Sequence, residues 1–89
     1  MSEFNSLHDW QVIDQQLSRS IRGLHKWEHR RQLELMHKNL TISVTSLSKA
    51  DVERRRYVRW PIYEEQLAKV QQQLQELQQW LTFATLLDN

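Results

Sequence analysis

Three residues in the first third of the chain have a spacing that could bind a metal. His25, Glu28 and His29 follow the pattern His-x-x-Glu-His, the inverted form of the zinc-peptidase motif. On a helix, positions 25 and 29 share one face, so two imidazoles could hold one Zn²⁺ while Glu28 acts as a base. Lys26 and Arg30 oppose this, because they surround the pair with positive charge. We therefore interpret the stretch as a solvated basic helix face and expect no metal and no cofactor.

Other catalytic arrangements are also missing from the sequence. Peptidases with the inverted motif need a large catalytic domain and a third acidic ligand, which 89 residues do not supply. One glycine cannot build a phosphate-binding loop, and the absence of cysteine excludes disulfides and thiolate metal sites. The carboxylates of Glu64, Glu65 and Glu76 are expected on the outer face of the last helix. We expect a protein that is not an enzyme.

The composition predicts one all-α domain. Only one glycine and one proline are available as turn residues, which favours long helices over sheets. Hydrophobic residues make up 39% of the chain and charged residues 26%, as in a globular protein. No apolar run approaches the ~18 residues of a membrane span, and no secretion signal is evident at the start. We expect a cytoplasmic location and no membrane partner.

The first helix is predicted over residues 7–39. Ser6 and Asp9 have the spacing of a capping box at its start. Gly23 weakens the middle of this helix by about 1 kcal/mol relative to alanine, so a kink or break there stays open. An apolar stripe recurs at steps of three, four or seven, as one helix face requires; its members are Trp10, Ile13, Leu17, Leu24 and Trp27.

A linker is predicted over residues 40–48. Leu40, Ile42 and Val44 alternate there with hydroxyl residues, a period of two in β-branched side chains. The segment could be an extended connection or a strand completed by a second chain. A short helix is expected over residues 49–60, and Pro61 suits the first turn of the helix after it.

The last helix is predicted over residues 61–86, because apolar residues step by four and three over three heptads. Together these elements predict an antiparallel helical hairpin with a short middle helix. Four tryptophans need more cover than a lone hairpin gives, so we expect self-association into a homodimeric bundle. The residues expected to mediate self-association are Tyr63, Leu67, Val70, Leu74, Leu77 and Leu81.

Two basic clusters are candidates for binding. Arginine beside exposed aromatic side chains can contact phosphates and stack on bases, as single-strand binders do. If the chain folds back on itself, the two clusters could share a surface. Solvated arginines, arginines paired within the chain and an acidic protein partner are the alternatives, and the alternating linker is also compatible with a ribbon-helix-helix strand. The candidate residues are Arg30, Arg31, Arg54, Arg55, Arg56, Tyr57, Arg59 and Trp60.

One resemblance links this pattern to DNA. His25, the pair Trp27-Glu28 and the run Arg31-x-Leu33-x-x-Met36, followed by Tyr63-Glu64-x-x-Leu67-Ala68, are similar to the C-terminal helical part of primosomal replication protein N″ (PriC). The resemblance covers roughly residues 25–81. It implies a role in replication restart, with single-stranded DNA, its coating protein and the replicative helicase as partners.

Two functional hypotheses follow. The first is a non-enzymatic helical interaction protein that uses its basic face on DNA or on a DNA-handling protein. The second is a small adaptor, chaperone or inhibitor that acts only through protein contacts. In that case exposed apolar residues, including Trp10, Trp80 and Phe83, would dock in a helix-in-groove mode.

Overall fold

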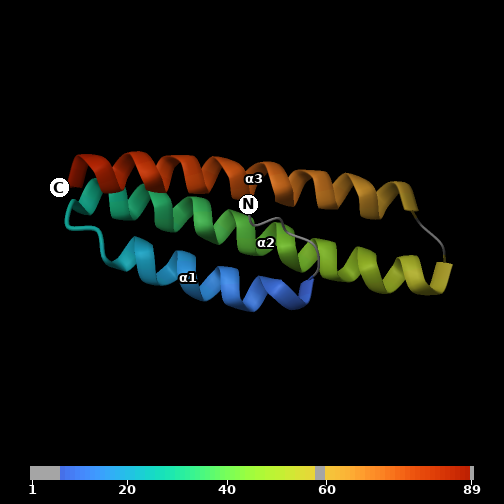
Figure 1. Cartoon of the computed structure of the whole chain (residues 1–89). Helices are drawn as coiled ribbons and strands as arrows, with labels where there is room; N and C mark the ends of the chain where they lie inside the picture. Colours follow the sequence, from blue (N-terminus) through green and yellow to red (C-terminus); the bar gives the residue numbers. More distant parts are fainter. Residues whose placement is uncertain (1–6, 58–59, 89) are drawn as a thin grey trace.

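The protein is a three-helix assembly in which two long helices form an antiparallel hairpin (Figure 1). The computed structural model describes residues 7–57 and 60–88, except for the side chain of Trp60. A short 3-10 turn, Leu7–Asp9, leads into α1 (Trp10–Arg22), α2 (Trp27–Tyr57) and α3 (Trp60–Asp88). The described residues contain no strand. None of the helices in the described part of the chain combines the length and the apolar character that a membrane crossing requires.

The core lies mainly between α2 and α3. Leu40, Leu47, Val70 and Leu77 have no exposed surface, and full burial of each such side chain contributes about 1.5–3 kcal/mol. Ser43 is the buried polar residue of this seam among the described residues. The predicted all-α class and the helical hairpin are therefore confirmed.

α1 covers only part of the hairpin. At ~1.5 Å per residue it is ~20 Å long, whereas α2 is ~46 Å long. Figure 1 shows α1 beside the first half of α2, which leaves the far end of the hairpin bare. Trp10, Leu17 and Ile21 are buried where α1 meets α2. A polar contact fixes the same interface, because Nε2 of His37 lies 2.6 Å from Oδ1 of Asp14.

The single helix predicted over residues 7–39 is wrong, because the chain turns back between α1 and α2. The alternative that the sequence left open, a break at Gly23, is the one that the structure has. The break follows Gly23, whose backbone N–H bonds to the carbonyl of Arg19 and ends α1. Leu24 is buried in this turn, whereas Trp27 is exposed. The turn resets the helical phase, so the apolar stripe of α1 does not continue to Trp27.

The predicted linker over residues 40–48 and the separate helix over 49–60 are also wrong, since α2 runs without interruption to Tyr57. Leu40, Val44, Leu47 and Ala50 are buried at helical spacing, whereas Ile42 is exposed. Packing of this stripe against α1 and α3 outweighs the local preference of β-branched residues for strands. Hydroxyls in the segment are satisfied inside the helix, as in the bond from Thr45 Oγ1 to the carbonyl of Thr41 (3.0 Å). The short helix of the fold is the N-terminal α1, not a middle element.

The last helix agrees closely with its prediction. The structure extends it to Trp60–Asp88, against the predicted 61–86. Pro61 occupies the first turn, where a missing backbone N–H costs nothing.

Candidate partner-binding surface

The turn between α1 and α2 is held by a residue from the far end of the chain. The carboxylate of Asp88 accepts the backbone N–H groups of His25 (2.8 Å) and Lys26 (2.9 Å). These hydrogen bonds, first that from His25 and then that from Lys26, hold the pKa of Asp88 below its ordinary value. Arg30 closes the other side, because its Nη2 donates to the carbonyl of Leu24 at 2.7 Å. Asp88 thus acts as a cap at the start of α2 that local sequence does not supply.

An exposed tryptophan and several cations surround this turn. Trp27 is 65% exposed, and the guanidinium of Arg31 lies 5.5 Å from its ring centroid. Arg22 and Lys26 are exposed as well. Within residues 7–57 and 60–88, none of the cations Arg22, Lys26 and Arg31 has an ion pair with a carboxylate. We call Arg22, Lys26, Trp27 and Arg31 the turn cluster; their charges are free to meet an anionic partner.

The arginines near the other end of α2 have a different environment. Arg54 and Arg55 bond to the two carboxylate oxygens of Asp51 at 2.8 Å and 3.0 Å. Arg54 also lies 4.2 Å from the ring centroid of Tyr63, so that its guanidinium joins α2 to α3. Asp51 therefore neutralises part of this cluster within the helix.

The remaining candidate residues of this region are partly described. Arg56 and Tyr57 are exposed at the end of α2. Arg59 lies outside the described residues, as does the side chain of Trp60. We call Arg54, Arg55, Arg56 and Tyr57 the tip cluster.

The two clusters do not share a surface. Because α2 is continuous, Arg30 and Arg54 lie ~36 Å apart along one helix. The conditional expectation that the chain would fold back and join them is wrong, since no turn separates them. A small ligand can therefore contact only one of the two clusters at a time.

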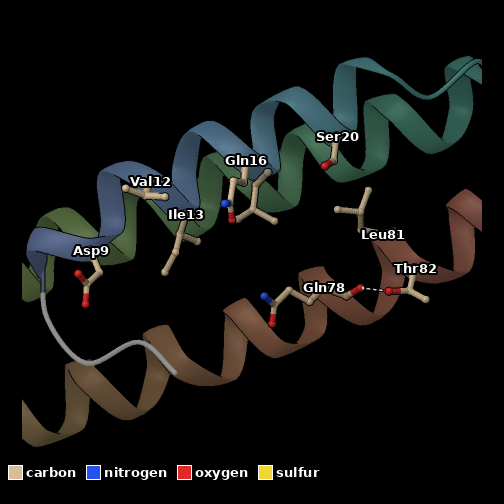
Figure 2. Close-up of a pocket in the computed structure, with 9 residues that line it drawn as sticks. Asp9, Val12, Ile13, Gln16, Ser20, Gln78, Leu81 and Thr82 are labelled. Carbon is tan, nitrogen blue, oxygen red and sulfur yellow. Dashed lines mark hydrogen bonds between the residues drawn. The ribbon is translucent and has the colours of Figure 1, made fainter. Parts of the chain in front are cut away.

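A groove lies between α1 and α3, which face each other across a gap (Figure 2). Its volume is about 730 Å³. Ile13 and Leu81 point into it from opposite walls, and Gln16, Gln78 and Thr82 add uncharged polar groups. Asp9, at one end, is the one titratable residue of the lining. This lining therefore lacks a pair of acid and base groups.

The candidate metal pair is not on one helical face. His25 lies in the turn before α2 begins, and His29 lies in the first turns of α2. Nδ1 of His29 is buried without a hydrogen-bond partner, beside Trp80 and Phe83. Across the described ranges no group of three histidine or carboxylate side chains could hold a metal ion.

The heptad residues of α3 are occupied within the chain. Val70, Leu74 and Leu77 are buried, and the remaining predicted self-association residues, Tyr63, Leu67 and Leu81, pack against the same core. They belong to the core of their own chain or pack against it, which leaves little of their surface for a second copy. Of the apolar residues proposed to dock a protein partner, Trp10 is buried, whereas Trp80 and Phe83 are about half exposed.

Sequence reasoning missed three parts of this region. Trp27 was assigned to the apolar stripe, and the capping contact of Asp88 joins residues far apart in the chain. The link between Asp14 and His37 was equally invisible, because it depends on how α1 returns along α2. The pairing of Arg54 with Asp51 had a readable signal, the i, i+3 spacing on a helix.

Comparison with known proteins gives no relative. No protein-family model, no curated protein and no solved structure matches the chain.

Proposed function

We propose that this is a non-enzymatic helical interaction protein that acts in the cytoplasm and binds DNA, or a protein that handles DNA, through the turn cluster. The observation that carries the proposal is the exposed ring of Trp27 with Arg31 against it, among cations that have no carboxylate partner within the described residues. An exposed aromatic ring gives a base something to stack on, and neighbouring cations attract the phosphates.

Single-stranded DNA is the ligand class we favour. Base stacking on an aromatic side chain contributes ~1–3 kcal/mol per base and needs an unpaired base. The resemblance of residues 25–81 to primosomal replication protein N″ points to the same class of ligand and supports a role in replication or repair.

The test is binding of fluorescently labelled single- and double-stranded oligonucleotides, followed by anisotropy across a salt series. Phosphate contacts would lower log affinity by roughly 0.7–0.9 per neutralised phosphate for each tenfold rise in salt. The double variant Trp27→Ala/Arg31→Ala removes one aromatic ring and one charge from the turn cluster. We expect a loss of about 1–3 kcal/mol, or roughly 5- to 150-fold in affinity.

A matched control exists at the other end of α2. Tyr57 is as exposed as Trp27, at 65%, and Arg55, two positions earlier in α2, is an exposed arginine of the same cluster. Arg55→Ala/Tyr57→Ala therefore makes the same chemical change in the tip cluster, and we expect affinity to change by less than about twofold. Equal losses in both variants, or no binding at low salt, would contradict the proposal.

A second candidate function is supported by a separate observation. Trp80 and Phe83 form an edge-to-face pair, with ring centroids 5.8 Å apart, on the surface of α3. Exposed aromatic pairs of this kind anchor protein partners. A small adaptor, chaperone or inhibitor would use this pair, and its binding would be lost in Phe83→Ala but kept in Trp27→Ala/Arg31→Ala.

A further inference from the structure

Six large apolar side chains remain on one side of the hairpin. They are between 40% and 57% exposed. We call this set the open face; it consists of Leu35, Ile42, Ile62, Trp80, Phe83 and Leu87.

The open face lies away from α1. His37 contacts α1, and Leu35, two positions earlier, is rotated by ~200° around α2. Gln78 and Thr82 line the groove that faces α1, and Trp80 between them is likewise turned ~200° away. Intervals of seven residues in α2 and in α3 then place Ile42 with Leu35 and Leu87 with Trp80.

The charges beside the open face differ in sign between the two helices. Lys38 and Lys49 flank Leu35 and Ile42 on α2, whereas Glu65 and Glu76 flank Ile62 and Trp80 on α3. All four are exposed, and none has an ion pair in the part of the chain that the structure describes. The two lysines and the two glutamates are each separated by three turns of helix, the same interval in both helices.

From this arrangement we infer that the open face binds a second copy of this chain, and that the dimer is a four-helix core with α1 of each copy on the outside. A two-fold axis parallel to the helices would place α2 of each copy antiparallel to α3 of the other. Within one chain, Asp88 lies level with Lys26, and Tyr63 lies level with Arg54.

The same axis keeps these levels between the two copies. Lys38 then comes within one helical turn of Glu76 of the second copy, and Lys49 within one turn of Glu65 of the second copy. Both pairs form in one register, and symmetry doubles each of them. The charges thus complement each other only if α2 of one copy packs against α3 of the other. The same arrangement brings the open faces of the two copies together.

The available area suits a stable dimer. The open face is ~46 Å long and about two helix diameters, or ~20 Å, wide, which gives roughly 900 Å² per copy. Stable complexes bury about 800 Å² per partner. This inference is separate from the proposed DNA binding, because the open face includes no residue of the turn cluster. It also differs from the heptad-mediated dimer predicted from sequence, whose residues are buried in the core of one chain or packed against it.

The test is the mass of the full chain in solution by sedimentation equilibrium, with helix content followed by circular dichroism. We expect twice the chain mass at micromolar concentration. Trp80→Glu and Ile42→Glu should each raise the dimer dissociation constant at least tenfold without loss of helix content. Val12→Glu introduces the same charge at an exposed site on α1 and should leave the dimer intact.

Charge reversal tests the register. Lys49→Glu and Glu65→Lys should each weaken the dimer several-fold, and the double variant in one chain should restore it. A wild-type chain that stays monomeric at 100 µM and above would overturn the inference, as would a dimer that Trp80→Glu and Ile42→Glu leave unchanged.

Discussion

The two ends of α2 carry arginine clusters of similar composition in different electrostatic states. At the turn, Arg31 stacks on an exposed tryptophan, and no carboxylate in the described residues pairs with it. At the tip, one carboxylate, Asp51, binds both Arg54 and Arg55. Spacing alone does not separate the two ends, because Glu28 and Glu34 each lie three positions from Arg31 on α2. A run of arginines is therefore a binding candidate only where the folded chain does not pair it with a carboxylate.

The two ends also differ in how they are held in place. The turn depends on contacts between residues far apart in the sequence, from Asp88 and from the Asp14–His37 link. The tip depends on contacts within one helix and on Arg54 against Tyr63. A substitution in one of these contacts should thus loosen only the turn or only the tip. A substitution in the core that both ends share should loosen both.

The largest effect is expected from the shared core. Leu77→Ala removes a side chain with no exposed surface and should lower the free energy of unfolding by about 2–5 kcal/mol. Urea denaturation, followed by circular dichroism, measures it. Val12→Ala, at an exposed position, should stay within about 0.5 kcal/mol of wild type. If tip and turn amides lost hydrogen-exchange protection to different extents in Leu77→Ala, the two ends would not share one core.

Removal of the long-range cap should loosen only the turn. Asp88→Asn keeps the shape of the side chain but removes its charge and one of its two acceptor oxygens. Hydrogen exchange should speed up at the amides of His25 and Lys26, while amides of residues 50–57 keep their protection. Equal loosening at both ends would show that Asp88 acts on the whole fold.

The same contact predicts a pH dependence. Because the pKa of Asp88 is lower in the folded protein than in the unfolded chain, its contribution to stability is fully present above the ordinary aspartate pKa. It is lost as the pH falls through the lowered value of the folded state. The difference in unfolding free energy between wild type and Asp88→Asn should therefore shrink with acidification and be constant above pH 5. A difference that grows toward acid would refute this assignment.

A smaller effect is expected when the tip cluster loses the carboxylate that pairs with its arginines, as the turn cluster has none in the described part of the chain. Asp51→Asn releases Arg54 and Arg55 from their carboxylate. Affinity for single-stranded DNA should rise several-fold, and the slope of log affinity against log salt should steepen by up to about one phosphate contact per released arginine. The loss of stability should be no more than about 1 kcal/mol. An unchanged slope would show that pairing with Asp51 is not the reason why the tip cluster binds DNA weakly.

The smallest effect is expected at Gly23. Its φ of −75° is ordinary for any residue, and an added Cβ would meet the carbonyl oxygens of Ser20 and Arg19 at 3.4 and 3.6 Å, which is normal contact. Gly23→Ala should therefore stabilise the protein by about 0.4–1 kcal/mol through the unfolded state. Thermal denaturation measures it, and a destabilised variant would mean that the turn needs the freedom of glycine.

The elements that could be predicted from sequence are those whose pattern is complete within the element. The seam from Tyr63 to Leu81 repeats over three heptads, so α3 was predicted almost to the residue. Leu40, Ile42 and Val44 show a period of two over a short window, and only the neighbours Leu33, Leu47 and Ala50 reveal the helical period. Local alternation was misleading because burial against α3 decides the conformation.

The candidate site was predicted only in part, for a similar reason. Basic residues are visible in any sequence, but their availability depends on partners. Asp51 lies close enough to Arg54 and Arg55 in the chain for its pairing with them to be predicted. Asp88 and His25, in contrast, are 63 positions apart in the sequence. Trp27 was misplaced because the phase of α2 depends on a turn that this distant contact holds.

The continuity of α2 sets a minimum length for any ligand that engages both arginine clusters together. The ~36 Å between them corresponds to about ten or eleven base pairs of a duplex that rises ~3.4 Å per pair. A shorter duplex can bridge nothing and is limited to the affinity of a single end. A longer one brings the second end within reach at high effective concentration, so that even a weak contact there would add to the retention of the ligand.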